Sequence, residues 1–248
     1  MMRCTDGHYY IVKFPANPQG TKTLVNEMLG TRLAERLGLP VAQTRLVYVS
    51  AGLIRLTQEL VFEMPRTRSP CPAGLCSGSL YQGDPRHGST WDFLPREYPL
   101  QNPCDFLGML LFDKWTCNTD ARQVVYQRIR DEYKAVMIDQ GFCFNASEWN
   151  FPDAPLRGRY KGAIAYERVA GIASFEPWLT RLERDLDKAA LADCAAGIPQ
   201  EWYGSTADLH QLLDRLCNRR FRVRELLSDM ARVRPRIFPN WSNAAAAD

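Results

Sequence analysis

Hydrophobic residues recur along this chain with strand-like and helix-like spacing, and the two patterns occupy different parts of it. In the N-terminal third, β-branched and aromatic runs predict strands at 8–14, 44–49 and 56–62, with a shorter strand at 79–82. Between the first two, apolar residues at helical spacing predict a helix over 23–37, which Gly38-Leu39-Pro40 ends. This third is therefore expected to be a small β-rich lobe with one helix.

The remaining chain is mainly helical, with one hairpin. The patterns predict helices at 105–118, 177–191, 206–216 and 222–231, and hairpin strands at 123–128 and 133–138. Residues 65–90 are rich in Pro and Gly and are expected to contain the joint between two lobes. We therefore expect an α+β chain with an N-lobe at 1–90, a C-lobe at 91–234 and a disordered tail at 235–248.

Two carboxylates flank the predicted hairpin. Asp120 lies before its first strand, and Asp139 follows its second strand in the tripeptide Asp139-Gln140-Gly141, where Gly141 is expected to let the backbone turn sharply. In kinases, one such carboxylate meets the attacking hydroxyl and the other holds Mg²⁺ on the ATP phosphates. Taken singly, Asp120 could instead cap a turn, so the ordered pair is more informative than either residue.

Lys13 lies inside the first predicted strand, and its neighbours Val12 and Phe14 point to the opposite face. On an edge strand Lys13 could face water, but an inward-facing lysine needs a counter-charge. Glu27, in the helix that follows, is a suitable partner. A strand lysine paired with a helix glutamate positions the ATP phosphates in protein kinases.

Composition narrows the function classes. The net charge is only +3, which favours neither nucleic-acid nor membrane binding, and no apolar run approaches the ~20 residues of a membrane span. The basic run at 219–224 is interpreted as a solvated helix end. The 8 cysteines form no disulfide framework, and Cys71 and Cys76 lack two further zinc ligands nearby. With no signal-peptide pattern, a cytoplasmic protein is expected.

Several segments together resemble the HipA-like kinases, in particular the short, stand-alone bacterial group. They are DGHYYIVKFPANPQGTKTLVNEMLGTRLAERLGLPVA, LLFDKWTCNTDARQ, VMIDQGFCFN, IPQEWYG and LLDRLCNRRFRV. The resemblance implies a two-lobed protein-kinase-like fold, related in its catalytic parts to phosphoinositide lipid kinases. The best-known members phosphorylate Ser or Thr of proteins and act as growth-arresting toxins.

The resemblance also implies roles for individual residues. Lys13 would contact the ATP phosphates, Glu27 would orient Lys13, Asp120 would be the catalytic aspartate and Asp139 the Mg²⁺ ligand. We also assign Gln82, at the end of the short predicted strand, to nucleotide binding.

The chain departs from the family pattern in three ways. Kinases of this kind usually have a metal-binding Asn five residues after the catalytic Asp, and here that position is Val125, so Gln123 is the candidate substitute ligand. The glycine-rich segment expected before the lysine strand is missing, because the chain begins at Met1, close to that strand. HipA toxins proper are longer and have an additional N-terminal region.

We therefore expect an ATP- and Mg²⁺-dependent kinase that transfers the γ-phosphoryl group to a hydroxyl, in the first place Ser or Thr of a protein. Two alternatives stay open. One is a nucleotide-binding pseudokinase with a regulatory role, and the other is a kinase acting on a small molecule or lipid. The sequence identifies neither the phosphoacceptor nor an antitoxin-type partner.

Overall fold

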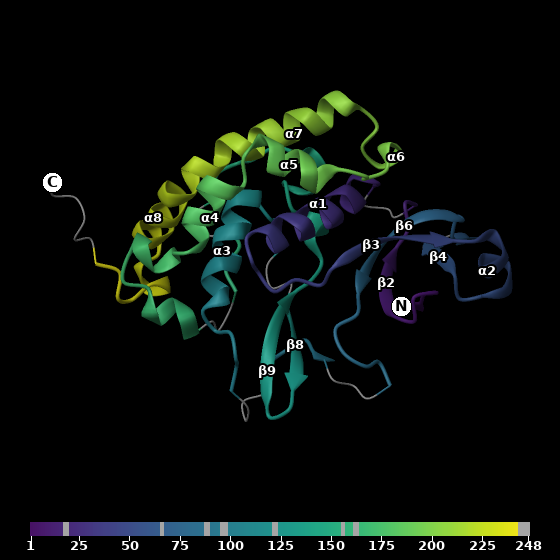
Figure 1. The fold of residues 1–248 in the computed structure, drawn as a ribbon, viewed down its shortest axis with the longest axis horizontal. Coiled ribbons are helices and arrows are strands. Elements are labelled where there is room, and N and C mark those ends of the chain that lie inside the picture. Colours follow the sequence, from purple (N-terminus) through teal and green to yellow (C-terminus); the bar gives the residue numbers. More distant parts are fainter. Residues whose placement is uncertain are drawn as a thin grey trace.

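The computed structural model describes residues 1–16, 20–64, 67–86, 90–94, 99–120, 124–154, 157–160 and 164–242. A strand-rich N-lobe and a mainly helical C-lobe lie on either side of the long helix α1 (Lys22–Arg36) (Figure 1). Within the described ranges, no helix has the length and apolar character that crossing a membrane requires.

The N-lobe is built on an antiparallel sheet with the order β1-β2-β6-β3. Its strands are β1 (Met2–Arg3), β2 (Tyr9–Lys13), β6 (Gly74–Leu80) and β3 (Thr44–Val49). In the central rows, Ser77 of β6 pairs with Lys13 on one side and Leu46 on the other. The face of the sheet opposite to Lys13 and Ser77 packs into a small core around Phe14, Val49, Cys71 and Cys76. The strands predicted at 8–14 and 44–49 are confirmed.

Two other strand predictions differ from the structure. The segment expected as a strand at 56–62 contains the end of helix α2 (Ala51–Leu56) and the start of β4 (Val61–Met64), which pairs with β5 (Thr67–Pro70). The hydroxyl of Ser50 accepts the Leu53 N–H at 3.1 Å and starts that helix. Of the strand expected at 79–82, residues 79 and 80 form the end of the longer strand β6. Strand β6 pairs with β2 on one edge and β3 on the other, and this pairing makes it a strand although its sequence has weak strand propensity.

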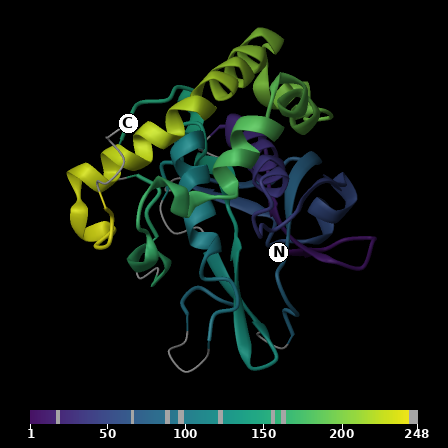
Figure 2. The same ribbon diagram turned by 60° about the vertical axis from the view of Figure 1, so that its left-hand side comes forward.

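The C-lobe surrounds helix α3 (Asp105–Thr116), nearly all of which is buried. Its other helices are α4 (Trp178–Asp185), α5 (Lys188–Ala195), α6 (Gln200–Tyr203), α7 (Thr206–Arg219) and α8 (Val223–Val233). The single helix predicted over 177–191 is two helices, because Asp187 caps α5 by accepting the Ala190 N–H at 2.9 Å. In both ribbon views, α7 and α8 follow one another along the side of the lobe away from the hairpin (Figure 2).

The predicted hairpin is confirmed as β8 (Val124–Ile129) and β9 (Glu132–Met137), with β7 (Thr90–Trp91) added to β8. Met137 N–H donates to the Pro40 carbonyl at 2.7 Å, and Ala42 N–H donates to the Met137 carbonyl at 2.8 Å. These bonds attach the hairpin to the segment that leads from α1 to β3.

Short 3₁₀ helices connect the remaining parts. They are η1 (Gln140–Phe142), η2 (Ala146–Glu148), η3 (Ile164–Arg168), η4 (Ile172–Phe175), η5 (Arg220–Arg222) and η6 (Pro235–Ile237). Most lie between Asp139 and α4, so the described residues between the hairpin and α4 have little regular structure.

The C-terminal segment expected to be disordered is folded as far as residue 242. Phe238 is buried, with its ring 5.8 Å from that of Tyr166 and 6.0 Å from that of Phe175. Residues 243–248 lie outside the described part of the chain.

The basic run at 219–224, interpreted as a solvated helix end, is partly buried. Arg219 is buried and donates to the carbonyls of Lys114 and Phe151.

The tight packing around α3 can be tested by comparing alanine substitutions at two glycines, one packed closely against the neighbours of α3 and one in α2 with room for a Cβ. A Cβ added at Gly108 would lie 2.6 Å from the side chains of Leu39 and Trp178, whereas one at Gly52 in α2 meets nothing closer than 3.7 Å. We expect Gly108→Ala to lower the free energy of unfolding by about 1–3 kcal/mol. Gly52→Ala should raise it by up to about 1 kcal/mol, because alanine favours helix. Urea unfolding would measure both, and equal effects would contradict this packing.

Candidate active site

Lys13, Glu27 and Asp139 come together from three distant parts of the sequence. The Lys13 ammonium group lies 2.7 Å from the Glu27 carboxylate and also contacts the Asp139 carboxylate. Glu27 is almost fully buried, and its second oxygen accepts the Ser79 hydroxyl at 3.0 Å. Lys13 therefore faces α1 rather than water, on the face of the sheet that also presents Ser77 and Ser79.

The charges of this cluster favour the ammonium form of lysine. Burial lowers the pKa of Lys13, but the neighbouring charges of Glu27 and Asp139 outweigh it, so the pKa lies above its ordinary value. Glu27 is inaccessible, whereas 36% of the Asp139 side chain is exposed. Of the two carboxylates, Asp139 is the one that a ligand or metal ion could reach.

The backbone turn at the end of β9 occurs at Asp139 itself. Asp139 has φ 55°, in the left-handed region that most residues avoid, and η1 begins directly after it. Gly141 does not have a positive φ, so the sharp turn expected at that glycine occurs two residues earlier, at Asp139. A Cβ at Gly141 would lie 3.4 Å from the Asp139 carboxylate and 3.6 Å from that of Glu27, so this glycine leaves room beside both.

Asn26, which sequence analysis did not single out, holds the segment after Asp139. Its side-chain amide donates to the carbonyls of Gly141, Cys143 and Ala146 at 2.9, 3.0 and 2.8 Å. Its side-chain oxygen accepts the Trp149 indole N–H at 2.8 Å. Asn26 is fully buried, so these bonds replace water for four otherwise unpaired groups. The sequence signal for this role was a polar asparagine inside an otherwise apolar stretch of helix, directly before Glu27.

Asp120 lies on the loop between α3 and β8, beside η1. Its backbone N–H donates to the Asn118 side-chain oxygen at 3.1 Å. The preceding residue, Thr119, donates its N–H to the Phe142 carbonyl at 3.1 Å. The loop with Asp120 is therefore hydrogen-bonded directly to the helix that follows Asp139.

The same asparagine connects Asp120 to a buried acid. Asn118 Nδ2 donates to Asp113 Oδ1 at 2.9 Å. Burial raises the pKa of Asp113 to about 7, although the Asn118 bond and nearby Tyr160 oppose the shift. Gly158, at φ +80°, packs on Asp113 so closely that a Cβ there would lie 2.5 Å from the Asp113 Cβ. Asp113 thus joins α3, the Asp120 loop and the segment around Gly158.

The other predicted site residues differ in outcome. Gln82 follows β6 and donates its side-chain amide to the Leu80 carbonyl at 2.8 Å, so its side chain folds back on the strand. Gln123 lies outside the described residues. Val125 is buried in an apolar cluster with Ala42 and Val136, where it supplies no oxygen to a metal ion.

The donor set fits a shared Mg²⁺ ion better than a protein-only metal site. Among the described residues, no group of three or more His, Cys, Asp or Glu side chains could hold a metal. Mg²⁺ is usually held by one or two carboxylates together with substrate phosphates and waters. The partly exposed carboxylate of Asp139, beside a lysine that could contact phosphate, meets that requirement.

A protein-family model matches the N-terminal part of the chain. The model of the HipA-like kinase family matches residues 1–69. The HipA-like stretch thus includes Lys13 and Glu27, and the resemblance inferred from the sequence is confirmed there. No curated protein matches the chain.

Solved structures extend the comparison to most of the chain. The Helicobacter pylori proinflammatory kinase CtkA has a TM-score of 0.49 and 15% identity, covering 92% of this chain and 91% of its own. A chain of the Shewanella oneidensis complex of HipA, HipB and operator DNA has a TM-score of 0.46 and 12% identity, covering 88% and 60%. Hydra Fam20, solved with sugar, has a TM-score of 0.50 and 11% identity, covering 93% and 77%. The fold is kinase-like.

The role of Asn26 can be tested against another buried polar residue of α1. Asn26→Ala removes the partner of three carbonyls and one indole N–H, and should lower the free energy of unfolding by about 3 kcal/mol or more. Thr31 is also buried, and its hydroxyl has no hydrogen-bond partner among the described residues. Thr31→Val should change stability by less than about 1 kcal/mol. Chemical denaturation would show whether the two differ.

Asp113 predicts a pH dependence of stability. Its folded-state pKa, about 7, lies above the ordinary aspartate value of 3.8, so the folded protein binds the proton more tightly than the unfolded chain. Stability should therefore fall between about pH 4 and 7, with a slope of up to about 1.4 kcal/mol per pH unit from this residue. In Asp113→Asn this part of the slope should vanish. Denaturation at several pH values would test it, and an unchanged slope would contradict the assignment.

Proposed function

We propose that this protein is an ATP-dependent kinase that transfers the γ-phosphoryl group to a hydroxyl, with Ser or Thr of a protein as the acceptor. The observation that supports it is the contact of one ammonium group, that of Lys13, with both Glu27 and Asp139. A lysine between a buried glutamate and a partly exposed aspartate is arranged to bind phosphate beside a metal ligand. The family match and the kinase-like fold support a phosphotransferase.

Each residue would act by position and charge. Lys13 would bind ATP phosphate oxygens, and Glu27 would hold the Lys13 side chain in place. Asp139 would hold Mg²⁺, which when bound neutralises charge on the phosphates. Asp120 would accept the proton of the acceptor hydroxyl as that oxygen attacks phosphorus. Catalysis would therefore depend on alignment and electrostatic stabilisation more than on covalent chemistry.

Alignment of Asp120 would depend on its neighbours. Asn118 binds both the Asp120 backbone and the Asp113 carboxylate, and Thr119 is bonded to Phe142 in η1. The proposed proton acceptor and the proposed metal ligand are thus attached to one hydrogen-bonded unit. Such a unit would keep their separation constant while a nucleotide binds.

One observation favours a second candidate, a nucleotide-binding pseudokinase with a regulatory role. Val125 stands where kinases of this kind place a metal-binding Asn, and it is buried among apolar side chains. Lys13, Glu27 and Asp139 alone could bind nucleotide without efficient transfer. In that case nucleotide would raise thermal stability, and no phosphoryl transfer would be measured.

Labelled ATP and Mg²⁺ would test the enzyme directly. We expect the purified protein to label itself or a mixed protein substrate. Asp120→Ala and Lys13→Ala should each reduce labelling by about 100-fold or more, the usual effect of removing one catalytic group. Lys188→Ala is the matched control, because Lys188 is an exposed lysine that pairs with Asp214 on the C-lobe surface. Its labelling should equal that of the wild type.

The outcomes separate the two candidates. Labelling that survives Asp120→Ala would show that transfer occurs elsewhere or by a contaminant, and would contradict the kinase proposal. Absence of labelling together with an ATP-dependent rise in melting temperature, lost in Lys13→Ala, would support the pseudokinase.

A further inference from the structure

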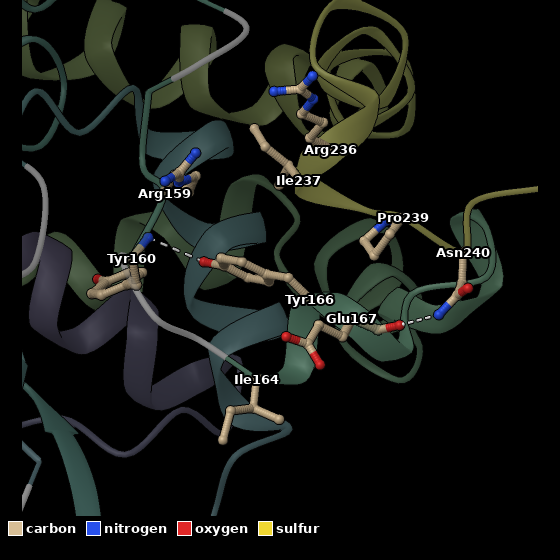
Figure 3. Close-up of a pocket in the computed structure, with 9 residues that line it drawn as sticks. All are labelled: Arg159, Tyr160, Ile164, Tyr166, Glu167, Arg236, Ile237, Pro239 and Asn240. Carbon is tan, nitrogen blue, oxygen red and sulfur yellow. Dashed lines mark hydrogen bonds between the residues drawn. The ribbon is translucent and has the colours of Figure 1, made fainter. Parts of the chain in front are cut away.

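A hollow on the C-lobe lies outside the cluster around Lys13. It has a volume of about 410 Å³ and lies between η3 and the segment that contains η6 (Figure 3). Its lining includes the apolar side chains of Ile164, Ile237 and Pro239 and the ring of Tyr166. This size suits a few side chains of a ligand rather than a whole protein surface.

Two arginines line the hollow. In the close-up, Arg159 and Arg236 lie on the same side of Tyr166, and the Glu167 carboxylate lies on the other side (Figure 3). Both arginines are exposed, and within the described part of the chain neither forms an ion pair. A guanidinium group can bind a carboxylate through two parallel hydrogen bonds. The lining thus combines apolar contact area with two available cationic groups.

The charged side chains that line the hollow are those of Arg159, Arg236 and Glu167, so its lining has a net charge of +1. The two arginines lie together and the glutamate lies on the other side of Tyr166, so the end of the hollow with the arginines is positive (Figure 3). Such a surface attracts negatively charged partners and raises their rate of association.

The hollow is connected to the proposed catalytic loop. Tyr160 lines it, and the Tyr160 N–H donates to the Tyr166 hydroxyl at 3.1 Å. Tyr160 also lies beside Asp113, whose carboxylate accepts a hydrogen bond from Asn118, the residue that holds the Asp120 backbone. The wall of the hollow and the loop with Asp120 are therefore parts of one packed unit.

We propose that this hollow binds an acidic segment of the protein acceptor, with Arg159 and Arg236 pairing with carboxylate side chains near the hydroxyl that is phosphorylated. This inference rests on the proposed function and adds a substrate class to it. The apolar lining would cover the aliphatic parts of the same segment. The two arginines would act as specificity residues, since they would contact the acceptor but not the transferred group.

Peptide binding without nucleotide tests the inference directly. The probes are two fluorescein-labelled peptides with a central serine, one flanked by glutamates and the other by glutamines. We expect the glutamate peptide to bind, and the doubly substituted Arg159→Glu, Arg236→Glu protein to bind it about tenfold or more weakly. Arg55→Glu is the matched control, because Arg55 is an exposed arginine on α2, and its affinity should stay near that of the wild type.

Two further variants protect the test against a folding defect. Arg159→Ala and Arg236→Ala each remove one exposed charge, and each should give an intermediate loss of affinity with an unchanged melting temperature. Equal binding of the glutamate and glutamine peptides would overturn the inference, as would equal losses in Arg55→Glu. Displacement of the peptide by single-stranded DNA at lower concentration than by unlabelled peptide would assign the hollow to a nucleic acid and would also overturn it.

The inference and the proposed function can fail separately. Asp120→Ala should bind the glutamate peptide like the wild type while losing phosphoryl transfer. Phosphoryl transfer that is equally fast to both peptides would contradict the acidic-substrate inference alone. Peptide binding through Arg159 and Arg236 without any transfer would contradict the kinase proposal and leave the binding site in place.

Discussion

The fold depends on an ammonium group that two carboxylates share. Lys13 comes from the sheet, Glu27 from α1 and Asp139 from the loop after the hairpin. Because Glu27 is almost fully buried, removing Lys13 would leave its charge without a counter-charge in a low-dielectric interior. This cost favours one arrangement of the sheet, α1 and the hairpin over alternatives in which any of the three is displaced.

Hydrogen bonds extend this arrangement into the irregular chain beyond Asp139. Asn26 binds three carbonyls of that segment and the indole of Trp149, and Asn118 joins the Asp120 loop to the core of the C-lobe. Each asparagine satisfies groups that no helix or sheet serves, which is why segments with little regular structure can still have a defined conformation. In this part of the protein, hydrogen bonds from side-chain amides take the place of the backbone hydrogen bonds of helices and sheets.

Local patterns predicted most of the longer helices and strands, and the pairing of Lys13 with Glu27, because these depend on neighbouring residues. Lys13 in an apolar strand requires a counter-charge, and Glu27 is available in the next helix, so their pairing followed from burial and spacing. Asn26 and Asp113 were not predicted, since their partners lie far along the chain or depend on three-dimensional packing. The order of residues 235–242 was missed because Phe238 is buried only by contacts with distant aromatic rings. The catalytic role of Asp120 stays a prediction.

The adjacency of Asn26 and Glu27 on α1 has a mechanical consequence. One residue is bonded to the segment after Asp139, and the next is bonded to the sheet through Lys13 and Ser79. Successive helical residues turn by about 100°, so a rotation of α1 that withdrew Glu27 from the sheet would also withdraw Asn26 from its carbonyls. Helix α1 therefore couples the sheet to the segment after Asp139, and the proposed phosphate-binding and metal-binding sides of the site would move together.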